Sequence, residues 1–358
     1  MDDPEKHNRI RAEMGRPSST IKTRGRKDTV GFGPHDADMA ALWATAITPP
    51  APDSLGPLPP PGAKVRAVIA PHDDYMYAGR VYRRILPMLT ARTVILIGVL
   101  HQWRRFDLRD RLVFDSYTRW SSAAGVAPVS DAREQLLSRL PGAHVVQSSM
   151  VHDSEHSLEA LLPWIHHVHP ELEIVPVLVA TSGFARLEAM AAAFAFALGE
   201  ILDQRGWELG RDVGIAISAD AIHYGADFRQ TRFGARGPWA YNAACVHDLG
   251  LLVGPLAGEV TRAKIRAAYE TWVDPAHPAN YRWTWCGRFS IPFGLLLLEQ
   301  LGGAHGWPIT YATSVSAPRL ALERLGFGVT APANDRHFVG YPAVAYTAPG
   351  LVAEGPDV

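Results

Sequence analysis

The segment VRAVIAPHDDYMYAG, residues 65–79, decides the interpretation of this chain of 358 residues. A short apolar run leads directly into a histidine and two aspartates, as in a strand that is buried on both faces and ends in a polar loop. Ligands of open α/β sheets bind outside the carboxyl ends of the strands. The segment therefore predicts a buried strand that delivers His72, Asp73 and Asp74 to a site.

Similar apolar runs alternate with helix-like stretches through the rest of the chain. Runs of the strand type occupy residues 65–71, 93–99, 172–180, 213–218 and 342–346, and helix-like stretches occupy 79–90, 156–168, 184–204, 239–257, 258–272 and 290–302. Alternating strands and helices build a sheet that helices cover on both faces. We expect an α/β fold with a central, mostly parallel or mixed sheet flanked by helices, in one domain from residue 64 to 358.

The chain before residue 64 has a different composition. Residues 1–29 are polar, carry both charge signs and lack apolar periodicity, which predicts a flexible arm without a catalytic role. Residues 30–63 contain a helix-like stretch at 36–46 and then PPAPDSLGPLPPPG, residues 49–62, whose prolines favour extended chain. A helix followed by a proline-rich strap is expected there.

Composition narrows the classes of function. The formal net charge is −1 and no block of lysine and arginine dominates, so neither nucleic acid nor an anionic membrane is an expected partner. The most apolar helix-like run, 185–202, is interrupted by charged residues, so no transmembrane helix is expected. The only cysteines are Cys245 and Cys286, and the start of the chain is polar, which predicts a cytoplasmic protein without a structural disulfide.

Histidines recur where the predicted strands end. The first strand runs into His72, the second into His101, and a later one into SADAIHYG, residues 218–225, which contains Asp220 and His223. A lone histidine in such a loop is commonly a hydrogen-bonded structural residue. Loops at the same edge of a sheet converge, so their repetition indicates a shared site.

Five segments, in the same order, resemble segments of Memo proteins, which share their fold with the catalytic subunits of class III extradiol dioxygenases. PHDDYMYAG (71–79) looks like PHAGYxYSG, ILIGVLHQ (95–102) like ILGPSHH, EHSLEALLPWI (155–165) like EHSLExxLPFL, ISADAIHYG (217–225) like ISSDFCHWG, and TWCGRFSIPFGLL (284–296) like ICGRxPIxxLL. The likeness extends from about Lys64 to Tyr346. It implies a bacterial-type relative of this group.

The resemblance implies that His72, His101 and Cys286 are metal ligands and that Asp220 and His223 are catalytic residues in the same pocket. In the extradiol enzymes a histidine placed like His223 serves in acid/base chemistry. Two imidazoles and a thiolate leave open coordination positions and suit Fe(II), Cu(I) or Zn(II), whereas Mg or Ca would require oxygen ligands. Fe(II) is the expected cofactor, with copper or zinc as alternatives.

Residues that flank the motifs are expected to bind substrate. They are Tyr75, Asp74, Glu155, His156, Trp285 and Arg288. Arg288 could clamp a carboxylate or pair with an acid of the pocket, and Glu155 and His156 could equally be a hydrogen-bonded pair that holds the pocket wall. Memo proteins have Ala-Gly where this chain has Asp73-Asp74. These carboxylates would repel an anionic substrate or hold an ammonium group.

These features predict a mononuclear non-haem iron oxidoreductase of the dioxygenase type, which would use dioxygen and a small aromatic or amino-acid-like substrate. Three alternatives stay open. The first is a non-catalytic copper- or iron-binding scaffold, a role associated with the Memo family. The second is a zinc-dependent hydrolase, because HDSEH, residues 152–156, matches the H-x-x-E-H string of one class of zinc peptidases. The third makes Cys286 a nucleophile paired with His223, or only a buried thiol. A homo-oligomer is compatible with each.

Overall fold

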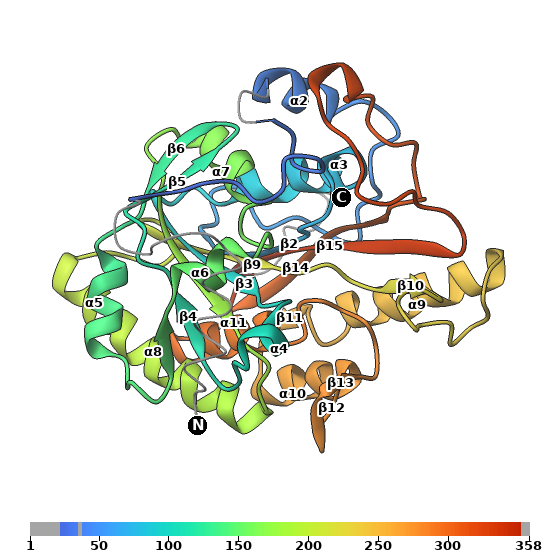
Figure 1. Cartoon of the computed structure of the whole chain (residues 1–358). Helices are drawn as coiled ribbons and strands as arrows, with labels where there is room; N and C mark the ends of the chain where they lie inside the picture. Colours follow the sequence, from blue (N-terminus) through green and yellow to red (C-terminus); the bar gives the residue numbers. More distant parts are fainter. Residues whose placement is uncertain (1–21, 35–37, 352–358) are drawn as a thin grey trace, which may run out of the picture.

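The computed structural model describes residues 22–34 and 38–351 (Figure 1). In chain order the elements are β1 (Thr23–Arg24), α2 (Met39–Thr45), β2 (Val65–Ala70), α3 (Tyr75–Ile85), η1 (Leu86–Met88), β3 (Thr93–Val99), α4 (Trp103–Phe106), β4 (Leu112–Phe114), β5 (Arg119–Ser122), β6 (Gly125–Pro128), α5 (Ala132–Arg139), β7 (Val145–Gln147), α6 (Ser149–Asp153), α7 (Leu162–Val168), β8 (Glu173–Val179), α8 (Phe184–Arg205), β9 (Val213–Ser218), β10 (His223–Gly225), α9 (Pro238–Val253), β11 (Gly258–Glu259), α10 (Arg262–Trp272), β12 (Val273–Asp274), β13 (His277–Tyr281), α11 (Ser290–Gln300), β14 (His305–Thr313), η2 (Glu323–Leu325) and β15 (His337–Thr347).

A sheet of ten strands runs through the middle of the molecule. Its order is β11-β14-β15-β2-β9-β3-β8-β4-β7, and β10 pairs with β15. The central neighbours β2, β9, β3 and β8 are parallel, whereas β14, β15 and β2 pair antiparallel. The prediction of an α/β fold with a mixed sheet is confirmed.

Helices cover both faces of this sheet (Figure 1). On one face α8, α10 and α11 pack their apolar residues, among them Leu187, Phe194 and Ile201 of α8. On the other face lie α2, α3 and α7, with the large side chains of Tyr82 and Trp164. Both hydrophobic clusters pack against the one sheet, which explains why its central strands are apolar at nearly every position.

The longest helix of the described chain, α8, has 22 residues and fits the predicted stretch 184–204. None of the helices within residues 22–34 and 38–351 has both the length and the apolar character that crossing a bilayer requires.

The predicted strands all form, but two parts of the sequence analysis are corrected. The helix expected at 156–168 begins only at Leu162, because residues 156–161 form turns beside the site described below. The strand β14 was not predicted, because Pro308 interrupts its apolar pattern. The pairing of β14 with β15 shifts register between Pro308 and Thr310, which is how a strand accommodates a proline.

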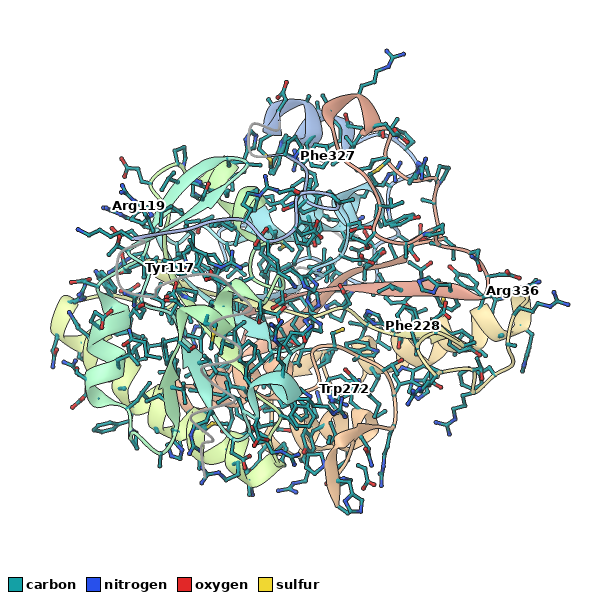
Figure 2. The ribbon with its side chains drawn as sticks, viewed as in Figure 1. Tyr117, Arg119, Phe228, Trp272, Phe327 and Arg336 are labelled. Atoms are coloured by element: carbon teal, nitrogen blue, oxygen red, sulfur yellow. The ribbon has the colours of Figure 1, made fainter. Side chains whose placement is uncertain are left out.

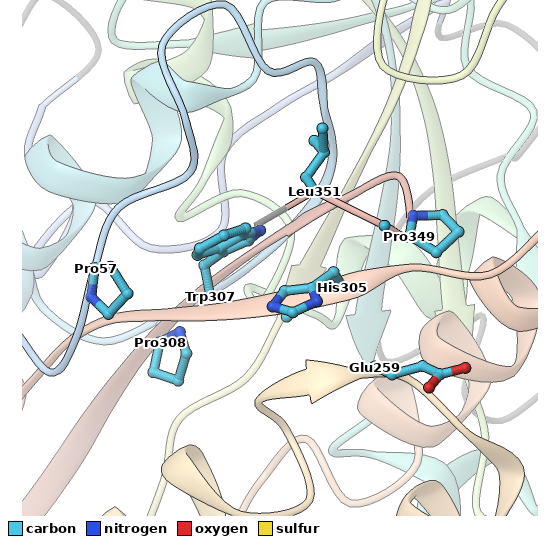
Figure 3. A pocket seen from close by; sticks show the side chains of 9 residues that line it. Pro57, Glu259, His305, Trp307, Pro308, Pro349 and Leu351 are labelled. Carbon is cyan, nitrogen blue, oxygen red and sulfur yellow. The ribbon is translucent and has the colours of Figure 1, made fainter. Parts of the chain in front are cut away.

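The proline-rich segment 49–62 runs along β14. Ser54 pairs with Thr310 as a single bridge, and the N–H of Leu55 donates to the carbonyl of Ile309 at 3.3 Å. Between this strap and β11 the outer side of β14 opens into a pocket of about 650 Å³ around Trp307 (Figure 3). None of the predicted site residues lines it.

The described part of the predicted loose arm, residues 22–29, is attached to the rest of the protein through Arg24. Arg24 is only 1% exposed. Its guanidinium donates to the Glu159 carboxylate at 2.8 Å and to the backbone carbonyls of His152 and Glu155 at 2.8 and 2.6 Å. The sequence could not show this contact, because Glu159 lies far along the chain. The remainder of the predicted arm, residues 1–21, lies outside the described residues.

The buried ion pair of Arg24 gives the first testable prediction. The change Arg24→Ala should lower the free energy of unfolding by about 3–5 kcal/mol, because Glu159 would stay buried without its cation. Urea unfolding followed by circular dichroism measures the loss. The matched control Arg92→Ala breaks the exposed pair of Arg92 with Glu173 and should cost less than about 1 kcal/mol. Equal losses in the two variants would contradict the interpretation.

Candidate metal centre

Three neighbouring parallel strands bring polar residues to one place. The strands β2, β9 and β3 lie side by side, and the chain continues from their carboxyl ends into His72, Asp220 and His101. Cys286 comes from a distant segment just before α11, where its N–H donates to the carbonyl of Asp220 at 3.2 Å. The loops predicted to converge therefore do so.

The three predicted metal ligands form a compact cluster. One nitrogen each from His72 and His101 and the sulfur of Cys286 lie within 4.8 Å of one another, and the same holds for Asp220, His223 and Cys286. Ligands bound to one metal at 2.0–2.3 Å are roughly 3–4 Å apart, so a small contraction would suit a metal ion. The structure thus brings together all five residues that the sequence singled out as ligands or catalytic groups.

Hydrogen bonds determine which nitrogen of each imidazole faces the cluster. His72 Nδ1 lies 2.8 Å from Ser218 Oγ, which donates its own hydrogen to the carbonyl of Ser157, so Nδ1 is the protonated atom. His101 Nδ1 lies 2.9 Å from the Glu155 carboxylate and donates to it. In both rings Nδ1 is thus engaged, and Nε2 is the nitrogen left to face the cluster. Within the described residues, buried His72 Nε2 makes no hydrogen bond and lies 3.4 Å from Asp220 Oδ2, a deficit that a metal would remove.

Glu155 orients His101 rather than a substrate. Its carboxylate accepts from the ring and the backbone N–H of His101 and from the N–H groups of His156 and Ser157. Burial disfavours the charged form, but His101 and these donors outweigh burial and hold the pKa of Glu155 well below its ordinary value. The alternative that Glu155 holds the pocket wall is therefore the one the structure supports.

Cys286 and His223 form a second close pair. Cys286 Sγ lies 3.6 Å from His223 Nε2. Burial alone would raise the pKa of the thiol, but the His223 cation and bonds from His101 and His72 hold it well below its ordinary value. Burial also opposes the charge on His223, yet the thiolate outweighs it and raises the pKa of His223 to about 10. Each member of the pair thus favours the charged form of the other.

The cluster opens into a pocket of about 380 Å³. Its lining includes His72, His101, His156, Asp220, His223 and Cys286. Its lining also includes Thr330, Ala331, Ala333 and His337, and Phe228 (labelled in Figure 2), whose ring lies 4.6 Å from that of His337. The volume is at the small end of ligand pockets and suits a molecule about the size of one ring.

The two aspartates that distinguish this chain from the Memo pattern tie the pocket wall to the loop of His72. Asp74 Oδ2 accepts from the N–H and the hydroxyl of Thr330 at 2.6 and 3.1 Å. Asp73 Oδ2 accepts from the Tyr341 hydroxyl at 2.7 Å. Burial and the neighbouring Asp73 raise the pKa of Asp74 to about 7. Both side chains reach the pocket, but their hydrogen bonds are to protein.

Three residues predicted to contact substrate do not line the pocket. Tyr75 and Trp285 are fully buried in the two hydrophobic clusters. Arg288, 4% exposed, packs 3.4 Å from the ring centre of Tyr281 and pairs with no carboxylate in the described part of the chain. The prediction was wrong because closeness in sequence does not determine direction: Tyr77, two residues after Tyr75, does line the pocket.

The zinc-peptidase interpretation of HDSEH is wrong. It requires both histidines on one helix, but α6 ends at Asp153. His152 Nε2 bonds to the carbonyl of Val113 at 2.9 Å, away from the cluster, whereas His156 lines the pocket with its ring 4.9 Å from that of His101.

A residue that the sequence analysis missed, Asp248 of α9, holds two of the site's segments together. Its buried carboxylate accepts four hydrogen bonds: from Trp283 Nε1 (2.8 Å) and Trp285 Nε1 (2.7 Å) at one oxygen, and from the Ile222 N–H (3.1 Å) and the Tyr311 hydroxyl (2.8 Å) at the other. These donors flank His223 and Cys286. The signal in the sequence that could have identified Asp248 was a single acidic residue inside the apolar segment NAACVHDLGLLV.

Fold and site together define a mixed α/β protein with a cluster of two histidines and a cysteine at the carboxyl edge of its sheet. The chain belongs to the Memo-like protein family, whose sequence profile matches residues 46–322. The predicted resemblance is confirmed.

Individual relatives agree with this assignment. MEMO1 family proteins of Pyrococcus furiosus and Thermococcus kodakarensis are 23% and 25% identical over 272 residues, which cover 74% of this chain and 85% of each relative. A MEMO1 family protein of Aquifex aeolicus is 30% identical over 167 residues, or 45% of this chain and 55% of the relative. The solved structure of an uncharacterized Escherichia coli K12 protein aligns with a TM-score of 0.40 at 10% identity, covering 77% of this chain and 98% of that one, a similarity too distant to carry an inference.

The role of Glu155 can be tested by metal affinity. Glu155→Gln should weaken Zn(II) binding about 10–100-fold, because an amide cannot accept from all the N–H groups that now orient His101. Competition with a chromophoric chelator gives the dissociation constant. Asp153→Asn is the control, because Asp153 bonds to Tyr117 and not to the cluster. An unchanged affinity in Glu155→Gln would show that His101 does not depend on this carboxylate.

Asp248 gives a second test on the same site. Asp248→Asn should weaken Zn(II) binding about 10–100-fold, because an amide leaves donors beside His223 and Cys286 without an acceptor. It should also change the sulfur-to-metal absorption of the Co(II) form. Tyr311→Phe removes a hydrogen bond to the same carboxylate but away from the site, so it should cost stability and spare affinity. If both variants lose only stability, Asp248 does not position the ligands.

Proposed function

We propose that this chain is a mononuclear metal-dependent oxidoreductase of the dioxygenase type, in which His72, His101 and Cys286 hold the metal. The observation that carries the proposal is geometric: one nitrogen each of His72 and His101 and the sulfur of Cys286 lie within 4.8 Å of one another, and buried His72 Nε2 makes no hydrogen bond within the described residues. Residues that only stabilise a fold would not gather three ligand atoms around a buried nitrogen without a partner.

The donor set suits Fe(II), Cu(I) or Zn(II), and we propose Fe(II) because Memo proteins resemble the extradiol dioxygenases. When bound, the iron would supply redox chemistry with dioxygen and open positions for substrate. Cys245 and Cys286 form no disulfide, and the reducing cytoplasm, where we propose that the protein works, would keep a thiolate ligand reduced.

The remaining residues of the pocket would bind substrate and move a proton. His223 completes no three-ligand set with the two histidines, so its imidazole is available to exchange a proton with a substrate hydroxyl or amino group. Asp220 and Asp73 make this side of the pocket acidic. Together with the volume of the pocket, this favours a small aromatic or amino-acid-like substrate that carries an ammonium group.

One observation favours a second candidate. The 3.6 Å contact between Cys286 Sγ and His223 Nε2 is also the geometry of an activated thiol nucleophile. In that case Cys286 would attack a carbonyl carbon, and His223 would give its proton to the leaving group. A scaffold role, with a bound metal and no turnover, is the third outcome that an experiment has to separate.

The decisive experiment compares variants of the ligands with a variant of the proton carrier. His72→Ala, His101→Ala and Cys286→Ala should each lose both metal and activity. His223→Ala should keep near-native iron and lose turnover by about 10²–10⁴-fold, the usual worth of a positioned proton carrier. Metal content after anaerobic purification and dioxygen consumption over catechols, aminophenols and aromatic amino acids are the measurements.

Each alternative function predicts a different result in the same experiment. A thiol nucleophile would keep ester hydrolysis in His72→Ala and lose it in Cys286→Ala. A scaffold protein would bind metal and consume no dioxygen with any substrate. If His223→Ala is stripped of metal, His223 is a ligand and not the proton carrier.

A further inference from the structure

The helix α9 is apolar on its outer face as well as on its inner face. Its inner side chains, including Ala244 and Leu252, are buried against the sheet. On the outer face Trp239, Val246 and Val253 are 77%, 67% and 55% exposed. A helix that is apolar all round is normally covered on all sides, so this outer face lacks a covering surface.

The exposed residues follow the spacing of a helix–helix seam. Trp239, Val246 and Val253 are separated by seven residues each, which is the repeat of paired helices. Half-buried Leu249 and exposed Gly250 lie on the same face. A Cβ atom at Gly250 would meet nothing within 4 Å, so the surface there is open to a partner. The outer face of α9 is called the α9 seam below.

We propose that the α9 seam binds the α9 seam of a second copy of this chain, antiparallel, about a twofold axis at Val246. A symmetric dimer requires a patch that complements itself. In this register Val246 meets Val246 of the second copy and Trp239 meets Val253. By their positions in α9, Leu249 then pairs with Ala243 and Asn242 with Gly250 of the second copy. Large side chains therefore lie opposite smaller ones along the seam.

Charges at the two ends of the helix select the antiparallel arrangement. Arg232 and Arg236, just before α9, are exposed and have no ion-pair partner within the described ranges. Glu259, shortly after α9, is likewise exposed and unpaired there. Antiparallel helices put the arginines of one copy near the glutamate and the negative helix end of the other. A parallel pair would place arginine against arginine.

The location of the seam fits a dimer that leaves the metal pocket in place. Figure 1 shows α9 at the opposite end of the molecule from α5. The loop that leads into α9 carries Phe228, which lines the pocket, and the inner face of α9 carries Asp248, which holds the segments of His223 and Cys286. The dimer would therefore form on the outer side of the helix that supports the site.

Sedimentation velocity of the full chain over a micromolar to near-millimolar range tests the proposal. The wild-type chain should form a dimer, and Val246→Arg should raise its dissociation constant by at least about 100-fold, because two arginines would meet at the axis. Phe196→Arg is the matched control: Phe196 is 70% exposed on α8, outside the seam, and its replacement should leave dimerisation unchanged. Circular dichroism confirms that the variants fold.

Charge reversal tests the antiparallel register. Arg236→Glu and Glu259→Arg should each weaken the dimer, and the double variant should recover it, because the reversed charges again face one another across the axis. A wild-type chain that stays monomeric at every concentration overturns the proposal. So does a dimer that is unaffected by Val246→Arg, and a double variant that is weaker than either single one overturns the antiparallel pairing.

Discussion

The parallel pairing of β2, β9 and β3 is the constraint on which the site depends. It puts three carboxyl ends next to one another, so that His72 and His101 meet Asp220, which lies more than a hundred residues further along the chain. The backbone of Asp220 then fixes Cys286 through one hydrogen bond. A shift of register in any of these strands would move its loop and separate the cluster.

Supporting groups around the cluster are buried and charged, and each is satisfied by specific partners. Glu155 accepts a hydrogen bond from His101, and Asp248 accepts hydrogen bonds from the segments of His223 and Cys286. Arg24 donates to the backbone carbonyl of Glu155. Such contacts are favourable only when complete, because a buried charge without partners is costly. These hydrogen bonds therefore hold the site in place, and removing one partner destabilises the fold because it leaves a buried charge unpaired.

Much of this arrangement follows from the sequence, and the rest does not for identifiable reasons. Apolar runs such as 93–99 and the histidines after them predict the central sheet and the ligands, because both depend on local pattern. The direction of Tyr75 and Trp285 depends on how each segment turns in space. Arg24 was assigned to a loose arm because its partner Glu159 is distant in sequence. The strand β14 was missed because Pro308 interrupts its apolar pattern.

The strand β15 has a consequence for biogenesis. It lies between β14 and β2, in the interior of the sheet, and its first residues and the loop before it form the pocket wall that Asp74 and Asp73 hold. The ribosome makes these residues after all the segments that carry the predicted metal ligands. The strand that bears His72 therefore lacks one neighbour until β15 joins the sheet, and the pocket is complete only once β15 has paired, later than the ligands themselves are made.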